Sequence, residues 1–247
     1  MSAELSDMTK GRYRIRSAST LQDLAAAQHL RGLAFGTDGP DRDSFDANCA
    51  HVLIEETATG ALVCCFRMMI IESGQALCDS YSAQYYDLSG LTGFSGRMVE
   101  LGRFCIHPER KDPDILRVAW VAMTRFVDEH RVEMLFGCSS FAGIQTEAYL
   151  DAFAVLKARH LAPKRWLPRV KAPDVFRFAA RLRRKPNAKL AMLTMPPLLR
   201  TYLMMGGWVS DHAVVDRQMN TLHVFTGVEI GAIPPARKRL LRAAATA

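Results

Sequence analysis

The order of the predicted strands and helices constrains the fold of this chain more than any other feature. Short β-branched and aromatic runs alternate with segments whose apolar residues recur every three or four positions. Such alternation favours a mixed α/β sheet covered by helices. In chain order, the pattern predicts strands at 13–16, 50–57, 61–71, 97–107, 132–138 and within 208–228, and helices at 21–35, 114–130, 147–160 and 196–205.

The chain of 247 residues fits one large domain. We expect residues 1–247 to form a single domain, with an insertion at 161–190. Between Lys157 and Lys189 the sequence has twelve lysines or arginines and one acid, Asp174, so this segment alone carries more charge than the +7 of the whole chain. A face this basic indicates an acidic partner: a carrier protein, an anionic membrane surface or nucleic acid.

Within the insertion, prolines at 173 and 186 bracket a predicted basic amphipathic helix. Its apolar stripe consists of Val175, Phe178, Ala179 and Leu182, and its cationic face of Arg177, Arg181 and Arg184. Such a helix docks an acidic carrier or rests on an anionic membrane. An ordinary surface helix packed on the sheet has the same pattern.

Several classes of protein are disfavoured by motifs that the sequence lacks. The six cysteines form no CxxC pair and the histidines no HExxH or HxxxH motif, so we expect no metal site. Residues 1–10 have no apolar core of a secretory signal, and no apolar run is long enough to span a bilayer. We therefore expect a cytoplasmic protein, with the inner face of the membrane as a peripheral site. No helix-turn-helix or RNP-like motif supports nucleic acid.

Glu100 and Arg103 lie in a predicted strand that is otherwise apolar. Burying either charge costs free energy unless the side chain is paired or used in chemistry. A structural ion pair is one interpretation, and a catalytic role is the other. In a regular strand the two side chains point to opposite faces, because they are three residues apart. A β-bulge between them would bring both to one face.

The order of the first elements resembles the GNAT acyltransferases, and the motifs resemble two families of that fold. Residues 100–106, Glu-Leu-Gly-Arg-Phe-Cys-Ile, resemble the signature of the ornithine N-acyltransferases and are similar to the Glu-x-x-Arg-Phe of acyl-homoserine-lactone synthases. The tryptophan that lactone synthases place before their acidic pair is missing, which favours the ornithine family. Further matches are Arg31, Phe35, Asp43, Phe45, Asp46, Cys49, His51, Arg67, Tyr81, Ser82, residues 86–89, 136–141 and 160–163.

The resemblance implies an α/β (α+β) GNAT-like fold, with a central mixed, mostly antiparallel sheet flanked by helices and a bulge in the strand at 97–107. It also implies transfer of a (3-hydroxy)fatty acyl group from acyl carrier protein to the α-amine of L-ornithine, which gives lyso-ornithine lipid. No cofactor is bound permanently in such a reaction, since the phosphopantetheine of the carrier holds the acyl group.

The chemistry of this reaction suggests roles for the matching residues. Glu100 and Arg103 are the catalytic candidates, with Glu100 taking a proton from the attacking amine. Gly102 would permit close approach of a backbone N–H to the thioester oxygen. An arginine would bind the ornithine carboxylate, and an acidic pair the δ-ammonium. The candidates for substrate binding are Arg31, Phe35, Asp43, Asp46, Arg67 and Gly102, with Arg103 as a third arginine.

The loop before the predicted helix at 114–130 bears on the acyl donor. Acetyl-CoA enzymes of this fold place a glycine-rich loop here, which binds a pyrophosphate at the helix N-terminus. This chain has Arg110 and Lys111 but no glycine between Pro108 and Asp114. The pattern favours the single phosphate of acyl carrier protein, which Arg110 and Lys111 would bind.

Three alternatives remain open at this point. A small-molecule N-acetyltransferase would use acetyl-CoA, and an acyl-homoserine-lactone synthase would accept S-adenosylmethionine. A non-enzymatic membrane- or nucleic-acid-binding module would use the basic insertion alone and would bind with a steep dependence on salt.

Overall fold

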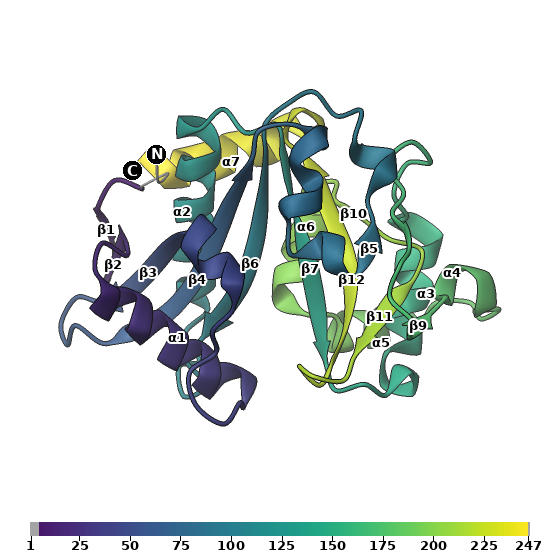
Figure 1. The fold of residues 1–247 in the computed structure, drawn as a ribbon, viewed down its shortest axis with the longest axis horizontal. Coiled ribbons are helices and arrows are strands. Elements are labelled where there is room, and N and C mark those ends of the chain that lie inside the picture. The colour runs from purple at the N-terminus through teal and green to yellow at the C-terminus, as the bar shows by residue number, and fades with distance from the viewer. Residues whose placement is uncertain (1–4, 247) are drawn as a thin grey trace. The chain divides into compact units, whose positions relative to one another are not determined.

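The computed structural model describes residues 5–246. Contacts divide the chain into two compact units. The first consists of the chain up to Ile70, Val99–Val132 and the residues from Pro235 on, and the second of Ile71–Met98 and Glu133–Pro234. The main elements of each unit are labelled in Figure 1.

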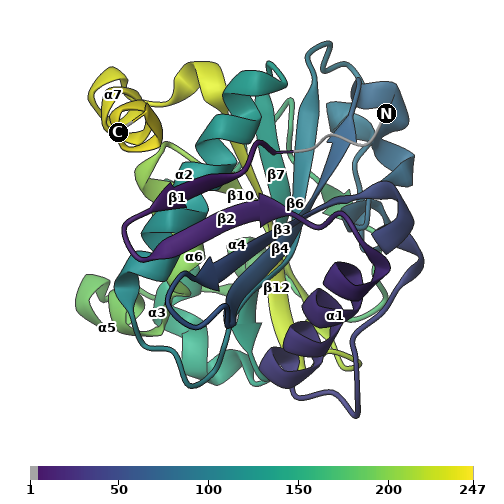
Figure 2. The ribbon, with the colours of Figure 1, turned by 90° about the vertical axis from the view of Figure 1, so that its left-hand side faces the viewer.

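The first unit is a sheet with helices on both faces. The strand order is β1-β2-β3-β4-β6, and the pairs from β1 to β4 are antiparallel. Helices α1 and α2 cover opposite faces, and α7 packs beside α2 (Figure 2). The elements are β1 Met8–Lys10, β2 Tyr13–Ser17, α1 Leu21–Phe35, η1 Ser44–Asn48, β3 Ala50–Glu56, β4 Leu62–Ile71, β6 Met98–Ile106, α2 Pro113–Glu129 and α7 Pro235–Thr246.

Local sequence sets the ends of the two main helices of this unit. Thr20 and Asp23 form a capping box at the start of α1, and Gly36 ends the helix with a φ of 68°. At α2, Asp112 caps the backbone N–H of Asp114, and Pro113 occupies the first turn. These signals explain why both helices were predictable to within one residue.

The second unit is built on a long antiparallel pair of strands that lie far apart in the sequence. β7 and β12 pair antiparallel over nine residues, from Met134 opposite Glu229 to Ala142 opposite Thr221. β11 and then β9 follow on the far side of β12, β10 also pairs with β12, and β5 pairs with β8. The elements are η2 Gly74–Asp79, η3 Ser82–Gln84, β5 Tyr86–Asp87, η4 Ser89–Leu91, β7 Met134–Ala142, η5 Thr146–Tyr149, α3 Leu150–Arg159, β8 Arg169–Val170, β9 Val175–Phe176, α4 Phe178–Arg181, α5 Ala188–Thr194, α6 Pro197–Met204, β10 Trp208–Val209, β11 Ala213–Asp216, β12 Thr221–Glu229 and η6 Ile230–Ala232.

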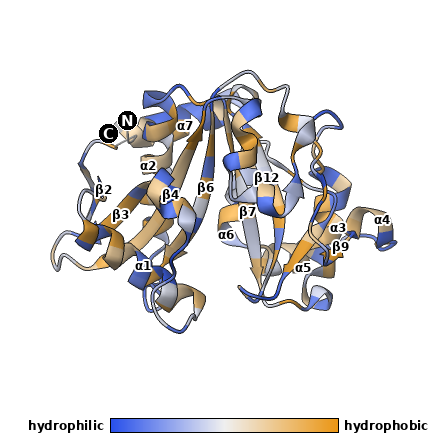
Figure 3. Ribbon diagram, in the orientation of Figure 1, coloured by the Kyte–Doolittle hydropathy of each residue, from blue (hydrophilic) through white to orange (hydrophobic). Residues whose placement is uncertain are grey.

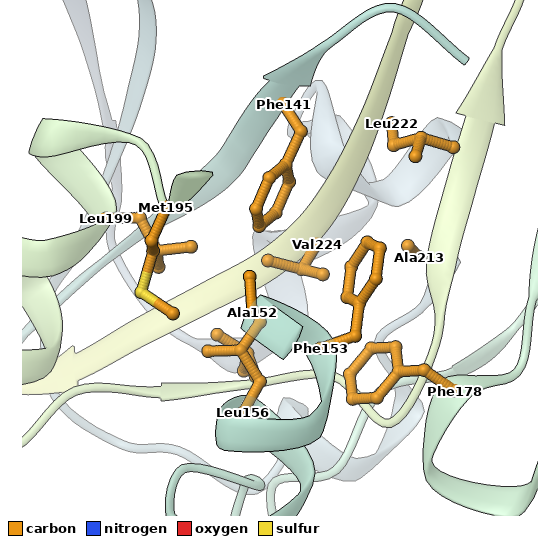
Figure 4. Packing of buried hydrophobic residues seen from close by; sticks show 11 residues of the cluster. Phe141, Ala152, Phe153, Leu156, Phe178, Met195, Leu199, Ala213, Leu222 and Val224 are labelled. Carbon is orange, nitrogen blue, oxygen red and sulfur yellow. The ribbon is translucent and has the colours of Figure 1, made fainter. Parts of the chain in front are cut away.

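The core of the second unit lies between its helices and the β7–β12 strand pair. Phe153 of α3 packs between Phe141 of β7 and Phe178 of α4, with ring centroids 5.1 Å from each (Figure 4). Val224 of β12 and Met195, just after α5, belong to the same buried cluster. The strands of the first unit are also rich in hydrophobic residues, as the orange colour of β3 shows in Figure 3.

The expected mixed, mostly antiparallel sheet flanked by helices is confirmed, and most predicted elements are present within a few residues. The prediction of a long helix between Pro173 and Pro186 is wrong. Val175 and Phe176 instead form a strand against β11, and only Phe178–Arg181 is helical. Part of the predicted apolar stripe belongs to the core: Phe178 is fully buried and packs on Phe153, and Ala179 and Leu182 pack against the same cluster. Helices α5 and α7 were not predicted.

None of the described helices is long and apolar enough to cross a membrane. Similarly, the described residues contain no group of three or more histidine, cysteine, aspartate or glutamate side chains that could hold a metal ion.

Candidate active site

Strand β6 carries both catalytic candidates. Glu100 is buried, with 5% of its surface exposed. Three residues later, Arg103 has a φ of 51°, which is rare for a residue other than glycine and interrupts the regular strand. A left-handed residue of this kind is typical of a β-bulge, so it supports the expected irregularity between Glu100 and Arg103. Gly102, between them, lies against the side chain of Arg67, because a Cβ at Gly102 would sit 3.4 Å from Arg67 Nε.

Arg31 anchors the site from helix α1. Its side chain is 1% exposed and is surrounded by hydrogen-bond acceptors. The Nε atom donates to Asp41 Oδ2 at 2.8 Å, and the Nη atoms donate to the Asp46 carboxylate at 2.8 and 3.1 Å. A fourth bond runs from Nη2 to the backbone carbonyl of Asp41. A guanidinium buried this deeply is stable only because every side of it meets an acceptor.

The segment between α1 and β3 supplies three carboxylates. Asp41 accepts from Arg31 and from Arg103 on a single oxygen, at 2.8 Å each. Asp43 caps the short helix η1 by accepting from the N–H of Phe45, and Asp46 lies within that helix. The loop is therefore tied both to α1 and to the irregular part of β6.

Arg67 of β4 completes the network from the sheet, where it lies opposite His51 of β3. It donates to Asp43 Oδ2 at 2.8 Å and to Asp46 Oδ1 at 2.6 Å, and its guanidinium lies over the Phe45 ring at 5.7 Å. We call the six charged residues the Arg/Asp network; they are Arg31, Asp41, Asp43, Asp46, Arg67 and Arg103.

The network keeps the carboxylates of Asp43 and Asp46 ionised. Burial alone would raise the pKa of Asp46, but hydrogen bonds from Arg31 and Gln28 outweigh it and hold the pKa well below its usual value. For Asp43, burial is likewise outweighed by Arg67 and by the charge of Arg103, and the pKa is lowered. Burial lowers the pKa of the adjacent His51, so that this imidazole is neutral near pH 7. The site thus presents fixed charges that need little rearrangement during a reaction.

Members of the network differ in their access to solvent. The side chains of Arg31, Arg67 and Asp46 are 1%, 3% and 6% exposed, whereas those of Arg103 and Asp43 are 11% and 18% exposed. Arg103 and Asp43 are also bonded to each other at 3.0 Å. These two residues form the accessible edge of the network, and the other members hold that edge in place.

The remaining predicted site residues lie outside the network. Phe35, at the end of α1, packs against a buried cluster that includes Leu30. Arg110 and Lys111 are exposed on the loop before α2, and Arg110 lies 3.8 Å from Glu56. The nearby N-terminus of α2 carries Asp112, whose pKa is lowered to about 2 by hydrogen bonds from Tyr13, the Asp114 N–H and Arg12.

Sequence reasoning missed Asp41 and Gln28. Asp41 bridges Arg31 and Arg103, and Gln28 donates to Asp46 at 2.9 Å. The available signal for Gln28 was its position three residues before Arg31, on the same face of the helix. For Asp41 the signal was weaker: a third acid close to Asp43 and Asp46 in a loop.

Comparisons with known proteins place the chain in a family. A model of the acetyltransferase (GNAT) domain matches residues 26–121. The structure of FeeM, an N-acyl amino acid synthase from uncultured soil microbes, has the same fold, with a TM-score of 0.52 over 90% of this chain and 94% of that one, at 9% identity. An L-ornithine N(alpha)-acyltransferase of Brucella abortus is 30% identical over 87% of this chain and 83% of its own. The enzyme of that name from Rhodobacter capsulatus is 32% identical over 86% of this chain and 88% of its own, and on this similarity the chain belongs to the L-ornithine Nα-acyltransferase family.

Proposed function

We propose that this protein transfers a fatty acyl group from the thioester of an acyl carrier protein to the α-amine of L-ornithine. The observation that carries the proposal is the family relationship, which covers most of the chain and is shared by relatives from different organisms. The Arg/Asp network supports it, because an amino acid with three charged groups needs a site with fixed charges of both signs.

The reaction forms a C–N bond and breaks the thioester C–S bond. The α-ammonium must first lose a proton, and we assign that step to Glu100, acting directly or through water. The thioester oxygen gains negative charge during the attack, and a backbone N–H next to Gly102 is the proposed donor to it. Forming the amide removes two protons from the ammonium: the first passes through Glu100 to solvent, and the second, lost by the nitrogen after the attack, ends on the sulfur of the released pantetheine. The α-amine is the less basic amine of ornithine, so more of it is neutral near pH 7.

Asp43 and Arg103 are the residues that we propose to recognise the acceptor. Asp43 would hold the δ-ammonium and Arg103 the carboxylate, because these are the most exposed side chains of the network. In this assignment Arg31, Arg67 and Asp46 contribute through the network, since each is almost completely buried and already bonded to acidic or basic partners.

The start of helix α2 favours a carrier protein over coenzyme A as the donor. Asp112 already accepts from the N–H of Asp114 at 2.9 Å, and Asp114 adds a second carboxylate in the first turn. Two carboxylates at this end of the helix disfavour a pyrophosphate, whose charge a helix N-terminus would otherwise attract. Arg110 and Lys111 remain available for the single phosphate of a carrier's pantetheine arm.

An acidic carrier would dock on the basic segment 157–189. Arg177 and Arg181 are exposed on either side of the buried Phe178, and Arg184 forms an ion pair with Asp151 at 3.1 Å. Replacing Arg177, Arg181 and Arg184 with glutamine should raise KM for the carrier and make it less sensitive to salt, because exposed charges act through a screened field. An unchanged KM across salt concentrations would remove this segment as the docking face.

One assay tests the proposed activity. The protein is mixed with 3-hydroxyacyl carrier protein and, in separate reactions, with ornithine, lysine or S-adenosylmethionine, and mass spectrometry detects free carrier thiol and acylated amine. Acylation of the ornithine α-amine is the expected result. The same product from acyl-CoA at equal rate would reject the carrier as donor, and a product from S-adenosylmethionine alone would favour a lactone synthase.

A further inference from the structure

Helix α5 presents three large apolar side chains to solvent. Leu190, Met192 and Leu193 are 47%, 50% and 74% exposed. Single exposed apolar residues are common, but three within four positions form a continuous apolar surface on a helix of seven residues. Such a surface gains free energy when something apolar covers it.

The outward orientation of these residues is fixed by the packing of α5. Asn187 caps the helix by accepting from the N–H groups of Lys189 and Leu190. Asp151 of α3 accepts from the N–H of Asn187 at 3.1 Å, and on the opposite side Ala191 is fully buried. The helix therefore cannot turn its apolar residues inward without breaking its cap and exposing the core.

The charged residues around α5 indicate which kind of partner covers its apolar side chains. From Val175 to Ser210 the sequence contains no aspartate or glutamate, yet it contains seven basic residues: Arg177, Arg181, Arg183, Arg184, Lys185, Lys189 and Arg200. Lys189 lies on α5 itself, and Arg200 of α6 donates to the backbone carbonyl of Met192 at 3.3 Å. Cations thus lie directly beside the exposed apolar side chains.

We propose that α5 is a membrane contact, with Leu190, Met192 and Leu193 seated at the boundary between headgroups and acyl chains of an anionic bilayer. Lysine side chains can keep their charge among lipid phosphates while their methylene stems follow the apolar layer. A short apolar face with cations beside it is the pattern of peripheral anchors that recognise anionic lipids. The biological purpose rests on the proposed function, since an acylated ornithine is a lipid that must enter a bilayer.

The test compares vesicle binding of matched variants by flotation. The wild type should bind vesicles of phosphatidylcholine mixed with phosphatidylglycerol more tightly than vesicles of phosphatidylcholine alone. Changing Met192 and Leu193 to serine should weaken binding at least about tenfold, and Lys189→Gln about fivefold. Leu21→Ser is the control, because Leu21 is 87% exposed on α1 and should leave binding unchanged.

Two further measurements make the test decisive. The Leu193→Trp variant should show a blue-shifted tryptophan emission with anionic vesicles, and an unshifted spectrum would overturn the proposal. Leu240 of the basic helix α7 is 64% exposed. If Leu240→Ser loses binding while the serine variant of α5 keeps it, the contact is at α7 and the proposal fails.

Activity is measured separately, without vesicles, on soluble carrier and ornithine. Unchanged acylation by the Met192 and Leu193 double variant, together with lost vesicle binding, supports a membrane role that is independent of catalysis. A protein that binds vesicles through α5 but acylates no ornithine would reject the proposed function and leave this inference standing.

Discussion

Asp46 offers the sharpest test of how the Arg/Asp network is built. Its carboxylate accepts from Arg31 at 2.8 and 3.1 Å, from Arg67 at 2.6 Å and from Gln28 at 2.9 Å, with 6% of the side chain exposed. The change Asp46→Asn keeps the shape of the side chain but removes its charge and one of its two acceptor oxygens. Two buried guanidinium groups then share a reduced negative charge.

The expected cost follows from these contacts. Removing one partner of a buried ion pair typically costs 3–5 kcal/mol, and the remaining amide oxygen still accepts, so we expect about 3 kcal/mol. For a chain of this size that corresponds to a fall in the melting temperature of roughly 6–12 °C. Urea unfolding followed by circular dichroism measures the free energy, and differential scanning calorimetry measures the midpoint.

Asp43→Asn is the matched control. Asp43 carries the same charge and contacts Arg67 and Arg103, but it lies at the accessible edge of the network. Because water can hydrate the arginine side chains there in place of the lost charge, we expect the free energy of unfolding to fall by only about 1 kcal/mol. The main effect should be on KM for ornithine. Equal stability losses in the two variants, or a loss below about 0.5 kcal/mol for Asp46→Asn, would refute the assignment of Asp46 to structure and Asp43 to recognition.

Further predictions concern chemistry and pH. Glu100→Gln should lower kcat about a hundredfold or more in the carrier assay, the usual contribution of a general base, and activity within a few-fold of wild type would return Glu100 to a structural role. Ornithine methyl ester should be a poor substrate if Arg103 binds the carboxylate; equal kcat/KM for ester and acid would contradict this. Burial lowers the pKa of His223 from 6.5 to about 4, so the folded protein takes up this proton later than the unfolded chain as pH falls. Stability should therefore drop by about 3 kcal/mol between pH 6.5 and pH 4, and His223→Gln should remove that part of the pH dependence in urea titrations.

Most of the fold was predictable because its signals are local. The capping box at Thr20 and Asp23 and the glycine at 36 set both ends of α1, and a clear apolar period set α2. The prediction for the segment after Pro173 failed for the opposite reason. Its apolar residues have helical spacing, yet Val175 and Phe176 pair with β11, so a tertiary contact overrides the local pattern.

The site was predictable in composition but not in connectivity. Five of the six charged members of the network were identified from motifs, whereas Asp41 was not, because its role depends on where the backbone places Arg103. The left-handed φ of 51° at Arg103 brings its Nε to the oxygen of Asp41 that also binds Arg31. The bridge thus couples α1 to the irregular part of β6 next to Glu100. A backbone conformation that costs roughly 1–2 kcal/mol is sustained by these charge-assisted bonds, which explains how a strained residue persists beside the catalytic candidate.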